Sequence, residues 1–170
     1  TQSGIMTHAY LMYGYPTQTI QETIDSLELV RQLFELGIIQ SGFWHQFAMT
    51  AHSPVGMYPE KFGVVKETES IGTFANNDIN FIDATGIDHE QFSFGLKKSL
   101  YNFMHGICFD YPLQDWFEFK IPKTKIPRGI RYWMNSKEIL IIENPNKIFN
   151  ILIIDKLIIP KNEINFNLKL

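Results

Sequence analysis

Hydrophobic and polar residues follow two different periods in the first fifty residues. Residues 8–13 form an uncharged run of aromatic and aliphatic side chains, which is typical of a short buried strand. From Ile20 to Phe34 the apolar residues recur at steps of three and four, so this segment predicts an amphipathic helix that ends at Gly37. Residues 43–49 form a second strand-like run. Strand, helix and strand joined so closely predict a βαβ unit with parallel strands.

The turn from Gly14 to Gln18 joins the first strand to the helix. After it, Thr19 and Glu22 have the spacing of a capping box, which places the start of the helix directly behind the turn. Parallel strands in such units bind ligands beyond their carboxyl ends, where backbone amides and the helix N-terminus face the cleft. Both this turn and the loop at 50–58 follow a strand at that end, so we expect binding residues in them.

A second helix is predicted over residues 89–105, after a short strand at 79–82 that leaves a polar loop. Asp88 is placed to cap this helix. Its apolar stripe consists of Phe92, Leu96, Leu100, Phe103 and Met104.

The C-terminal third changes character. A basic connector interrupted by prolines spans residues 121–129, and β-branched runs within residues 131–159 predict a small antiparallel sheet. The predicted fold is therefore α/β, with residues 1–121 forming the βαβ unit and the following helical region. Residues 122–170 form a small β-rich C-terminal region.

Composition narrows the class of protein. The 170 residues are 45% hydrophobic and 14% aromatic, as in a globular chain. Residues 1–85 carry three basic and nine acidic side chains and residues 86–170 carry twelve and nine, but the basic residues are scattered, so we expect no nucleic-acid binding. No apolar run reaches the length of a membrane span and no signal peptide is evident, so no membrane partner is expected. A single cysteine fits a reducing cytoplasm.

Three histidines lie in or beside the predicted strands. His8 and His45 fall inside them and His52 stands in the loop after the second. Strand alternation puts His8, Tyr10 and Met12 on one face. Neutral imidazoles at the carboxyl end of a strand can hydrogen-bond to a substrate or transfer a proton, so all three are predicted substrate-binding residues, with a purely structural role as the alternative. Their spacing is not that of a metal site, and no metal is expected.

A hydrolase is a further alternative because Ser53 follows His52, but adjacent residues seldom face each other as nucleophile and base. The lone thiol of Cys108, beside Phe109, is predicted to be a small buried hydrophobic group.

Residues 14–19, Gly-Tyr-Pro-Thr-Gln-Thr, resemble the Gly-Phe-Pro-x-Glu-Thr segment late in the barrel of radical SAM enzymes. The second strand and the segment from Thr50 to Tyr58, which contains Pro54, resemble the sixth strand and exit loop of that family. The likeness spans residues 4–63 and is greatest to members that carry an N-terminal cobalamin-binding domain. The resemblance implies that this part of the chain is the end of a partial (β/α) barrel.

The resemblance also implies a cofactor site. Gly14, Pro16, Thr17 and Gln18 would run past the methionine and ribose parts of S-adenosylmethionine, chiefly through backbone groups. Related sequences often have Glu where this chain has Gln18. An amide can accept from a ribose hydroxyl but brings no negative charge.

The chain departs from the family in its cysteines. Radical SAM enzymes hold a [4Fe–4S] cluster with three closely spaced cysteines, whereas this chain has only Cys108. We therefore expect it to be the C-terminal region of a larger radical SAM, iron–sulfur enzyme and to be inactive alone. Its partners would be the upstream barrel and cobalamin-type domain, or a second copy through exposed strand edges.

The complete enzyme would cleave S-adenosylmethionine reductively and use the radical for methyl transfer or rearrangement. It would hold S-adenosylmethionine and the [4Fe–4S] cluster, with the use of cobalamin left open, while this chain alone would bind none of them. The alternative is a non-enzymatic accessory or interaction module derived from the same fold.

Overall fold

The computed structural model describes residues 4–67 and 77–129. The chain divides into a compact unit, Thr1–Pro127, and a second unit, Arg128–Leu170, and only the first is described below. Strands β1 (His8–Tyr13) and β2 (Ser41–Gln46) pair in parallel and are joined by helix α1 (Ile20–Glu35), as the sequence predicts.

Strand β2 begins and ends earlier than the apolar run at 43–49. The register pairs His8 with Ser41 and Tyr13 with Gln46, and the Phe47 amide donates to the Tyr13 carbonyl at 2.8 Å. Beyond Tyr13, β1 turns away at Gly14. The later residues of the run therefore leave β1, and the Met49 carbonyl accepts from the Ile79 amide at 2.8 Å instead.

Both ends of α1 are as predicted. The Glu22 amide donates to Thr19 Oγ1 at 3.3 Å and the Thr19 amide donates to Glu22 Oε2 at 2.8 Å, which completes the capping box. At the other end Gly37 has a φ of 66°. Its amide and that of the next residue donate to carbonyls of the last turn, both at 2.9 Å, in a Schellman motif. These local bonds fix where α1 begins and ends.

The second predicted helix begins later than expected. A 3-10 turn at Glu90–Phe92 precedes helix α3 (Ser93–Met104), and Asp88 Oδ1 accepts from the Glu90 amide at 3.0 Å. Of the predicted stripe, all members are buried except Met104, which is 37% exposed. The prediction for Met104 is wrong because it lies about 100° around the helix from the buried Phe103, at the margin of the covered side.

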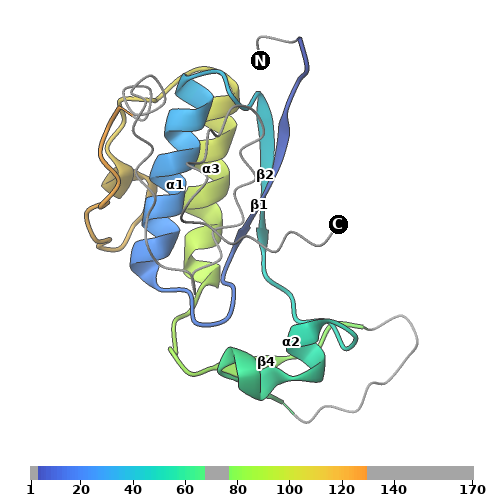
Figure 1. Cartoon of the computed structure of the whole chain (residues 1–170). Coiled ribbons are helices and arrows are strands. Elements are labelled where there is room, and N and C mark those ends of the chain that lie inside the picture. The colour runs from blue at the N-terminus through green and yellow to red at the C-terminus, as the bar shows by residue number, and fades with distance from the viewer. Residues whose placement is uncertain (1–3, 68–76, 130–170) are drawn as a thin grey trace, which may run out of the picture. The chain divides into compact units, whose positions relative to one another are not determined.

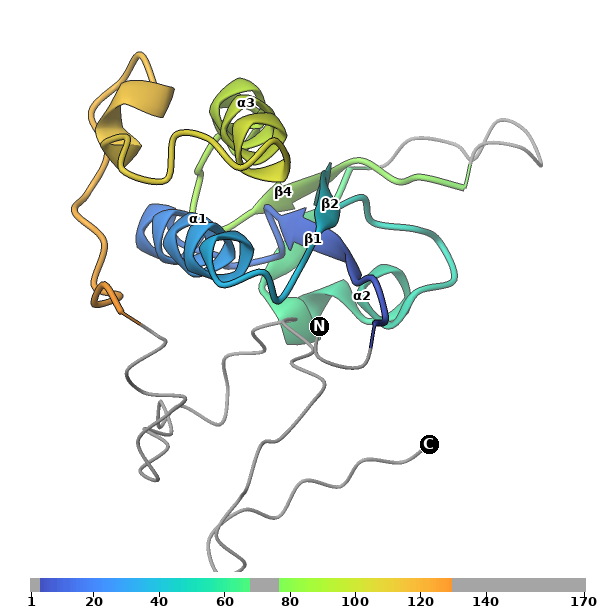
Figure 2. The same cartoon turned by 90° about the horizontal axis from the view of Figure 1, so that it is seen from above.

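Helices α1 and α3 lie side by side on one side of the β1–β2 sheet (Figures 1 and 2). The core between helices and sheet is apolar. Its most buried members are Tyr13, Ile24, Leu27, Val30, Trp44, Phe92, Leu96, Leu100 and Phe103. One side of the sheet is thereby fully occupied by the hydrophobic core.

A second, smaller cluster lies at the carboxyl end of the two parallel strands (Figure 1). It contains helix α2 (Pro54–Met57) and the antiparallel strands β3 (Val64–Lys66) and β4 (Phe81–Asp83) around buried Met49, Val55 and Val64. The short strand predicted at 79–82 is therefore confirmed within one or two residues.

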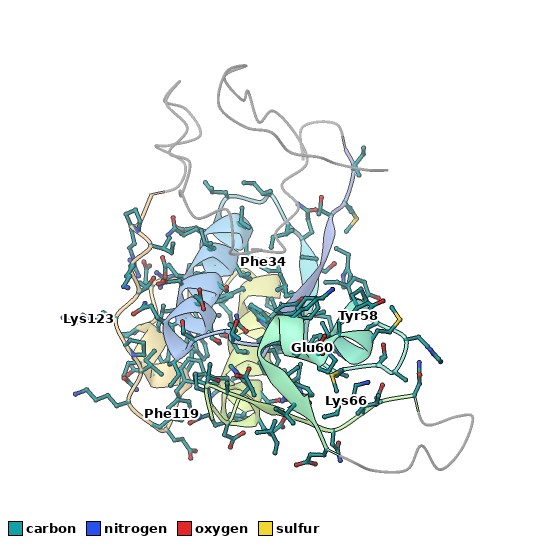
Figure 3. All side chains as sticks on the ribbon, turned by 60° about the horizontal axis from the view of Figure 1, so that its bottom comes forward. Phe34, Tyr58, Glu60, Lys66, Phe119 and Lys123 are labelled. Atoms are coloured by element: carbon teal, nitrogen blue, oxygen red, sulfur yellow. The ribbon has the colours of Figure 1, made fainter. Side chains whose placement is uncertain are left out.

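The connector at 121–127 is held along α1. Gln21 Nε2 donates to the Lys123 carbonyl at 3.0 Å, the Lys125 amide to Asp25 Oδ1 at 2.7 Å, and Gln32 Nε2 to the Pro127 carbonyl at 3.0 Å. Figure 3 places Lys123 on this segment beside α1. The compact unit accordingly runs to Pro127, past the boundary predicted at residue 121.

The fold is thus mixed α/β, with a parallel two-stranded sheet, helices and a small antiparallel sheet. Over residues 4–67 and 77–129 the parallel strands number two, so a barrel is not formed by this part of the chain. The predicted sheet at 131–159 lies outside the described residues. Within the same described ranges, no helix combines the length and the apolar character needed to cross a lipid bilayer.

Candidate functional site

The two sides of the β1–β2 sheet differ, and we call the side away from the helices the open face. It carries His8, Tyr10 and Met12 from β1, paired in register with Ser41, Phe43 and His45 from β2. Tyr10 is 80% exposed and Phe43 is 48% exposed. The shared face predicted for His8, Tyr10 and Met12 is confirmed by this alternation.

Ring contacts run across the open face. His8 and Tyr10 have centroids 5.2 Å apart, Tyr10 and Phe43 6.5 Å, and Phe43 and His45 6.1 Å. The His8 Nδ1 and Ser41 Oγ atoms are 2.7 Å apart and share a hydrogen bond. The six side chains include no Asp, Glu, Lys or Arg. The open face therefore offers aromatic surface with an imidazole at either end.

The Gly14–Gln18 turn lies at the carboxyl end of β1. Gly14 has a φ of 73°, and its amide donates to the side-chain Oε1 of Gln18 at 2.5 Å. Pro16 is buried, whereas Thr17 is exposed and has an unusual φ of 67°. The resemblance directs the side-chain amide of Gln18 towards a ribose. In this structure its oxygen already accepts a hydrogen bond from within the turn.

Asp83, at the end of β4, holds this turn from the other cluster. The Thr17 amide donates to Asp83 Oδ2 at 2.7 Å and the Thr85 amide donates to Oδ1 at 2.7 Å. Burial raises the pKa of Asp83, but the hydrogen bonds from Thr85 and Thr17 outweigh it, so its pKa lies below the ordinary value. An ionised Asp83 thereby stabilises a positive φ at a non-glycine residue.

His89 is buried against the same turn, with 7% of its surface exposed. A Cβ added at Gly14 would lie 3.1 Å from the His89 Cβ and 3.3 Å from its Cγ, so the two residues are in close contact. Neither ring nitrogen has a hydrogen-bond partner among the described residues. Burial lowers the pKa of His89, and the charges of Asp83 and Asp88 oppose that shift only in part.

Buried polar groups continue from the turn into the core. The Tyr13 hydroxyl donates to Gln46 Oε1 at 3.4 Å and also interacts with the Ser93 side chain. Burial raises the pKa of Tyr13, the bond with Ser93 lowers it, and the charge of Glu90 raises it further. The net upward shift keeps the phenol neutral, so that it acts as a hydrogen-bond donor in this cluster.

The loop after β2 is organised by Ser53. Its Oγ donates to the Thr50 carbonyl at 2.8 Å and accepts from the Gly56 amide at 3.0 Å, so it caps α2. His52 is exposed beside it. The serine hydroxyl proton is thus already used in a backbone bond, which disfavours the hydrolase alternative.

Cys108 is half-buried, in contrast to the buried position predicted from its neighbours. The chain follows α3 through Gly106 at a φ of 71°, and Cys108 itself has a φ of 64°. Its Sγ lies 3.7 Å from Asn102 Oδ1. This tight reversal at the end of α3 directs the thiol to the rim of the core, which the run of apolar neighbours did not indicate.

The predicted site residues fall in three places. His8 and His45 share the open face at opposite ends of the register, His52 lies in the loop beyond β2, and the Gly14–Gln18 turn lies at the carboxyl end of β1. Sequence reasoning missed His89 and Asp83, both of which reach this turn from distant positions. The only local signal was Asp88, which was predicted to cap the second helix and lies next to His89 in the sequence.

In the part of the chain that the structure describes, no three His, Cys, Asp or Glu side chains gather in a group able to hold a metal ion. The single cysteine of the whole sequence cannot supply the three thiolates of an iron–sulfur cluster. Comparisons with family models, curated proteins and solved structures found no match to this chain.

Proposed function

We propose that this chain supplies one wall and one ligand-binding turn of a larger (β/α) enzyme similar to the cobalamin-type radical SAM proteins. The observation that carries the proposal is the open face. Helices α1 and α3 cover one side of the parallel sheet, while the other side carries exposed aromatic and imidazole side chains and no charged ones. A sheet in a barrel has this asymmetry, since its helices lie outside and its inward side chains line the interior.

The role of the open face in such an enzyme would be to bind and orient a substrate. Tyr10, Met12 and Phe43 would contact apolar parts of it and exclude water. His8 and His45 would hydrogen-bond to polar atoms at either end. Reductive cleavage of S-adenosylmethionine would be the chemistry supplied when cluster and cofactor are bound elsewhere in the enzyme, because the residues of this chain do not fit a cluster site.

The Gly14–Gln18 turn would hold one edge of the cofactor. Three of its amides are already bonded, that of Gly14 to Gln18 Oε1, that of Thr17 to Asp83, and that of Gln18 to the Tyr15 carbonyl. The hydroxyl of the exposed Thr17 is therefore the group we assign to cofactor contact. Pro16 itself keeps the turn rigid through its fixed φ.

The test is an amide chemical-shift titration of the 170-residue chain with S-adenosylmethionine at millimolar concentration. We expect weak binding with shifts confined to the Gly14–Gln18 turn and its neighbours. Thr17→Val keeps the side-chain shape but removes the hydroxyl, and should weaken binding about two- to tenfold, as the loss of one hydrogen bond predicts. His105→Ala, on the exposed end of α3, is the control variant and should bind as the parent does.

Two results would overturn this assignment. One is the absence of any shift in the turn, and the other is tight binding that Thr17→Val leaves unchanged. Tight binding would indicate a complete cofactor site on this chain alone.

A non-enzymatic interaction module remains the second candidate, because β1 and β2 each have a free edge among the described residues and the open face is aromatic. Its partner would be a second copy joined through these edges, with the open face in contact between the two copies. Sedimentation equilibrium of Phe43→Lys distinguishes the two functions, with Tyr101→Lys on exposed α3 surface as the matched control. Self-association that only Phe43→Lys abolishes would favour the module.

A further inference from the structure

His89 has an arrangement that packing alone does not explain. A buried imidazole normally donates from one nitrogen and accepts at the other, yet neither His89 nitrogen has a partner among the described residues. The side chain is held in place by close contact with Gly14, which has no Cβ to obstruct it. Burial favours the neutral ring over the charged one, and an added proton would make the ring a strong donor with no acceptor in its present position.

Asp83 is the candidate acceptor, because its charge acts on His89 more strongly than that of Asp88 does. Its charge acts on His89 and that of His89 acts on it. The same carboxylate accepts the Thr17 amide at 2.7 Å and so fixes the Gly14–Gln18 turn. Besides the Thr85 amide on Oδ1, this carboxylate has two possible donors, the turn and the imidazole. Of these two, only the turn is bonded when the imidazole is neutral.

We propose that Asp83 and His89 form a two-state latch on the Gly14–Gln18 turn, in which a proton taken from solvent by His89 draws the Asp83 carboxylate from the Thr17 amide to the imidazolium. When His89 is neutral, the turn is in its closed state, in which Gly14 contacts His89 and the Thr17 amide is bonded to Asp83. In the protonated state His89 leaves its buried position beside Gly14, and the turn loses its contacts with both His89 and Asp83. The latch concerns the turn itself and does not depend on the proposed function.

The other described groups near His89 are acidic or uncharged, and none of them opposes its protonation by charge repulsion. Asp88 precedes it and favours the proton, as Asp83 does. Glu90 follows it and acts on Tyr13, whose phenol is neutral. Strand β2 contributes the uncharged Gln46 beside Gly14. The groups around the position are acidic or neutral. A protonated His89 that has left the buried site would therefore be attracted to the carboxylates.

The direction of the pH dependence follows from the two pKa shifts. The pKa of His89 is lowered from 6.5 in the closed state, so the released state takes up a proton first and the closed turn loses stability as the pH falls below 6.5. The loss levels off below the lowered pKa. Asp83 has a pKa below its ordinary 3.8, so it stays ionised throughout this interval and is available to the imidazolium.

The experiment is amide hydrogen exchange and histidine-ring titration by NMR on the 170-residue chain, from about pH 7.5 to about pH 5, across the range where an imidazole changes charge. We expect protection of the Thr17 amide, corrected for intrinsic exchange, to fall by up to about tenfold for each pH unit below 6.5. The His89 ring should titrate below the ordinary imidazole value of 6.5.

Variants separate a latch from a merely structural contact. His89→Phe keeps an aromatic ring but cannot titrate, and should abolish the pH dependence of Thr17 protection. His105→Phe should retain it. If His89→Phe fails to fold, Asp83→Asn decides the question, because loss of the carboxylate should lower the pKa of His89 further and reduce Thr17 protection at every pH.

The latch is overturned if His89 titrates at or above pH 6.5. It is equally overturned if His89→Phe keeps the pH dependence, or if Asp83→Asn leaves both the His89 titration and Thr17 protection unchanged. None of these readouts involves S-adenosylmethionine, so the failure of the latch and the failure of the proposed function are distinguishable.

Discussion

The covered and open faces of the β1–β2 sheet are built from alternate residues of the same two strands. On the covered face Leu11, Tyr13 and Trp44 are buried against α1 and α3. On the open face Tyr10 and Phe43, which are of similar size and apolar character, remain exposed. Hydrophobicity alone therefore does not decide burial here, because the position of the helices does.

The comparison separates the residues that fold this unit from those that are free for another task. Burial of large side chains supplies the main stabilisation of a domain, so the covered face is expected to carry most of the folding free energy. An aromatic face left exposed contributes little to folding. Its side chains need another explanation, such as contact with a ligand or a partner.

Substitution of neighbouring residues in β2 is the strongest test of this difference. Trp44→Ala removes a side chain that is 2% exposed and should lower the free energy of unfolding by about 3–5 kcal/mol. Phe43→Ala, one residue earlier, should lower it by about 0.5 kcal/mol or less. Urea unfolding followed by circular dichroism measures both, and equal losses would show that the open face is buried in the folded protein.

A smaller effect is expected at the carboxyl edge, where both faces end. Gly14→Ala forces an L-residue to a φ of 73° and brings its Cβ against His89, which should cost about 1–3 kcal/mol. Gly86→Ala is the matched control, since Gly86 has a φ of 63° with no atom within 4 Å of the added Cβ. The excess loss in Gly14→Ala over the control measures the contact with His89, and no excess would contradict that contact.

The smallest change is expected within the open face itself. His8→Ala removes an exposed hydrogen bond to Ser41 and should change the free energy of unfolding by about 0.5 kcal/mol or less. Ser41→Ala should have the same effect, and the double variant should cost no more than either one. Additive losses in a double-mutant cycle would mean that the two side chains act separately.

Local signals in the sequence were sufficient for the elements of the βαβ unit. The Thr19 and Glu22 capping box and Gly37 predicted both ends of α1, because each bond joins residues within one or two turns. The alternation in β1 predicted which side chains share a face. It did not predict which face the helices cover, since that depends on the position of α3, far along the chain.

The contacts around the Gly14–Gln18 turn were beyond local reasoning. Asp83 and His89 reach the turn from more than sixty residues away and carry no motif that links them to it. The turn itself was identified from its glycine, its proline and its resemblance to a known segment. Its hydrogen-bonding partners required the three-dimensional arrangement.

The connector along α1 also determines where an added group would stand. Its bonds progress from Gln21 in the first turn to Gln32 near the last, a rise of about 16 Å along the helix. Helix α1 leads away from the carboxyl ends of the strands, so Pro127 is delivered to the opposite pole of the unit from the Gly14–Gln18 turn. A fluorophore or fusion partner attached at Pro127 would therefore leave the approach to that turn unobstructed. The same group attached at Thr85 would lie beside the turn, because the Thr85 and Thr17 amides bond to the same carboxylate.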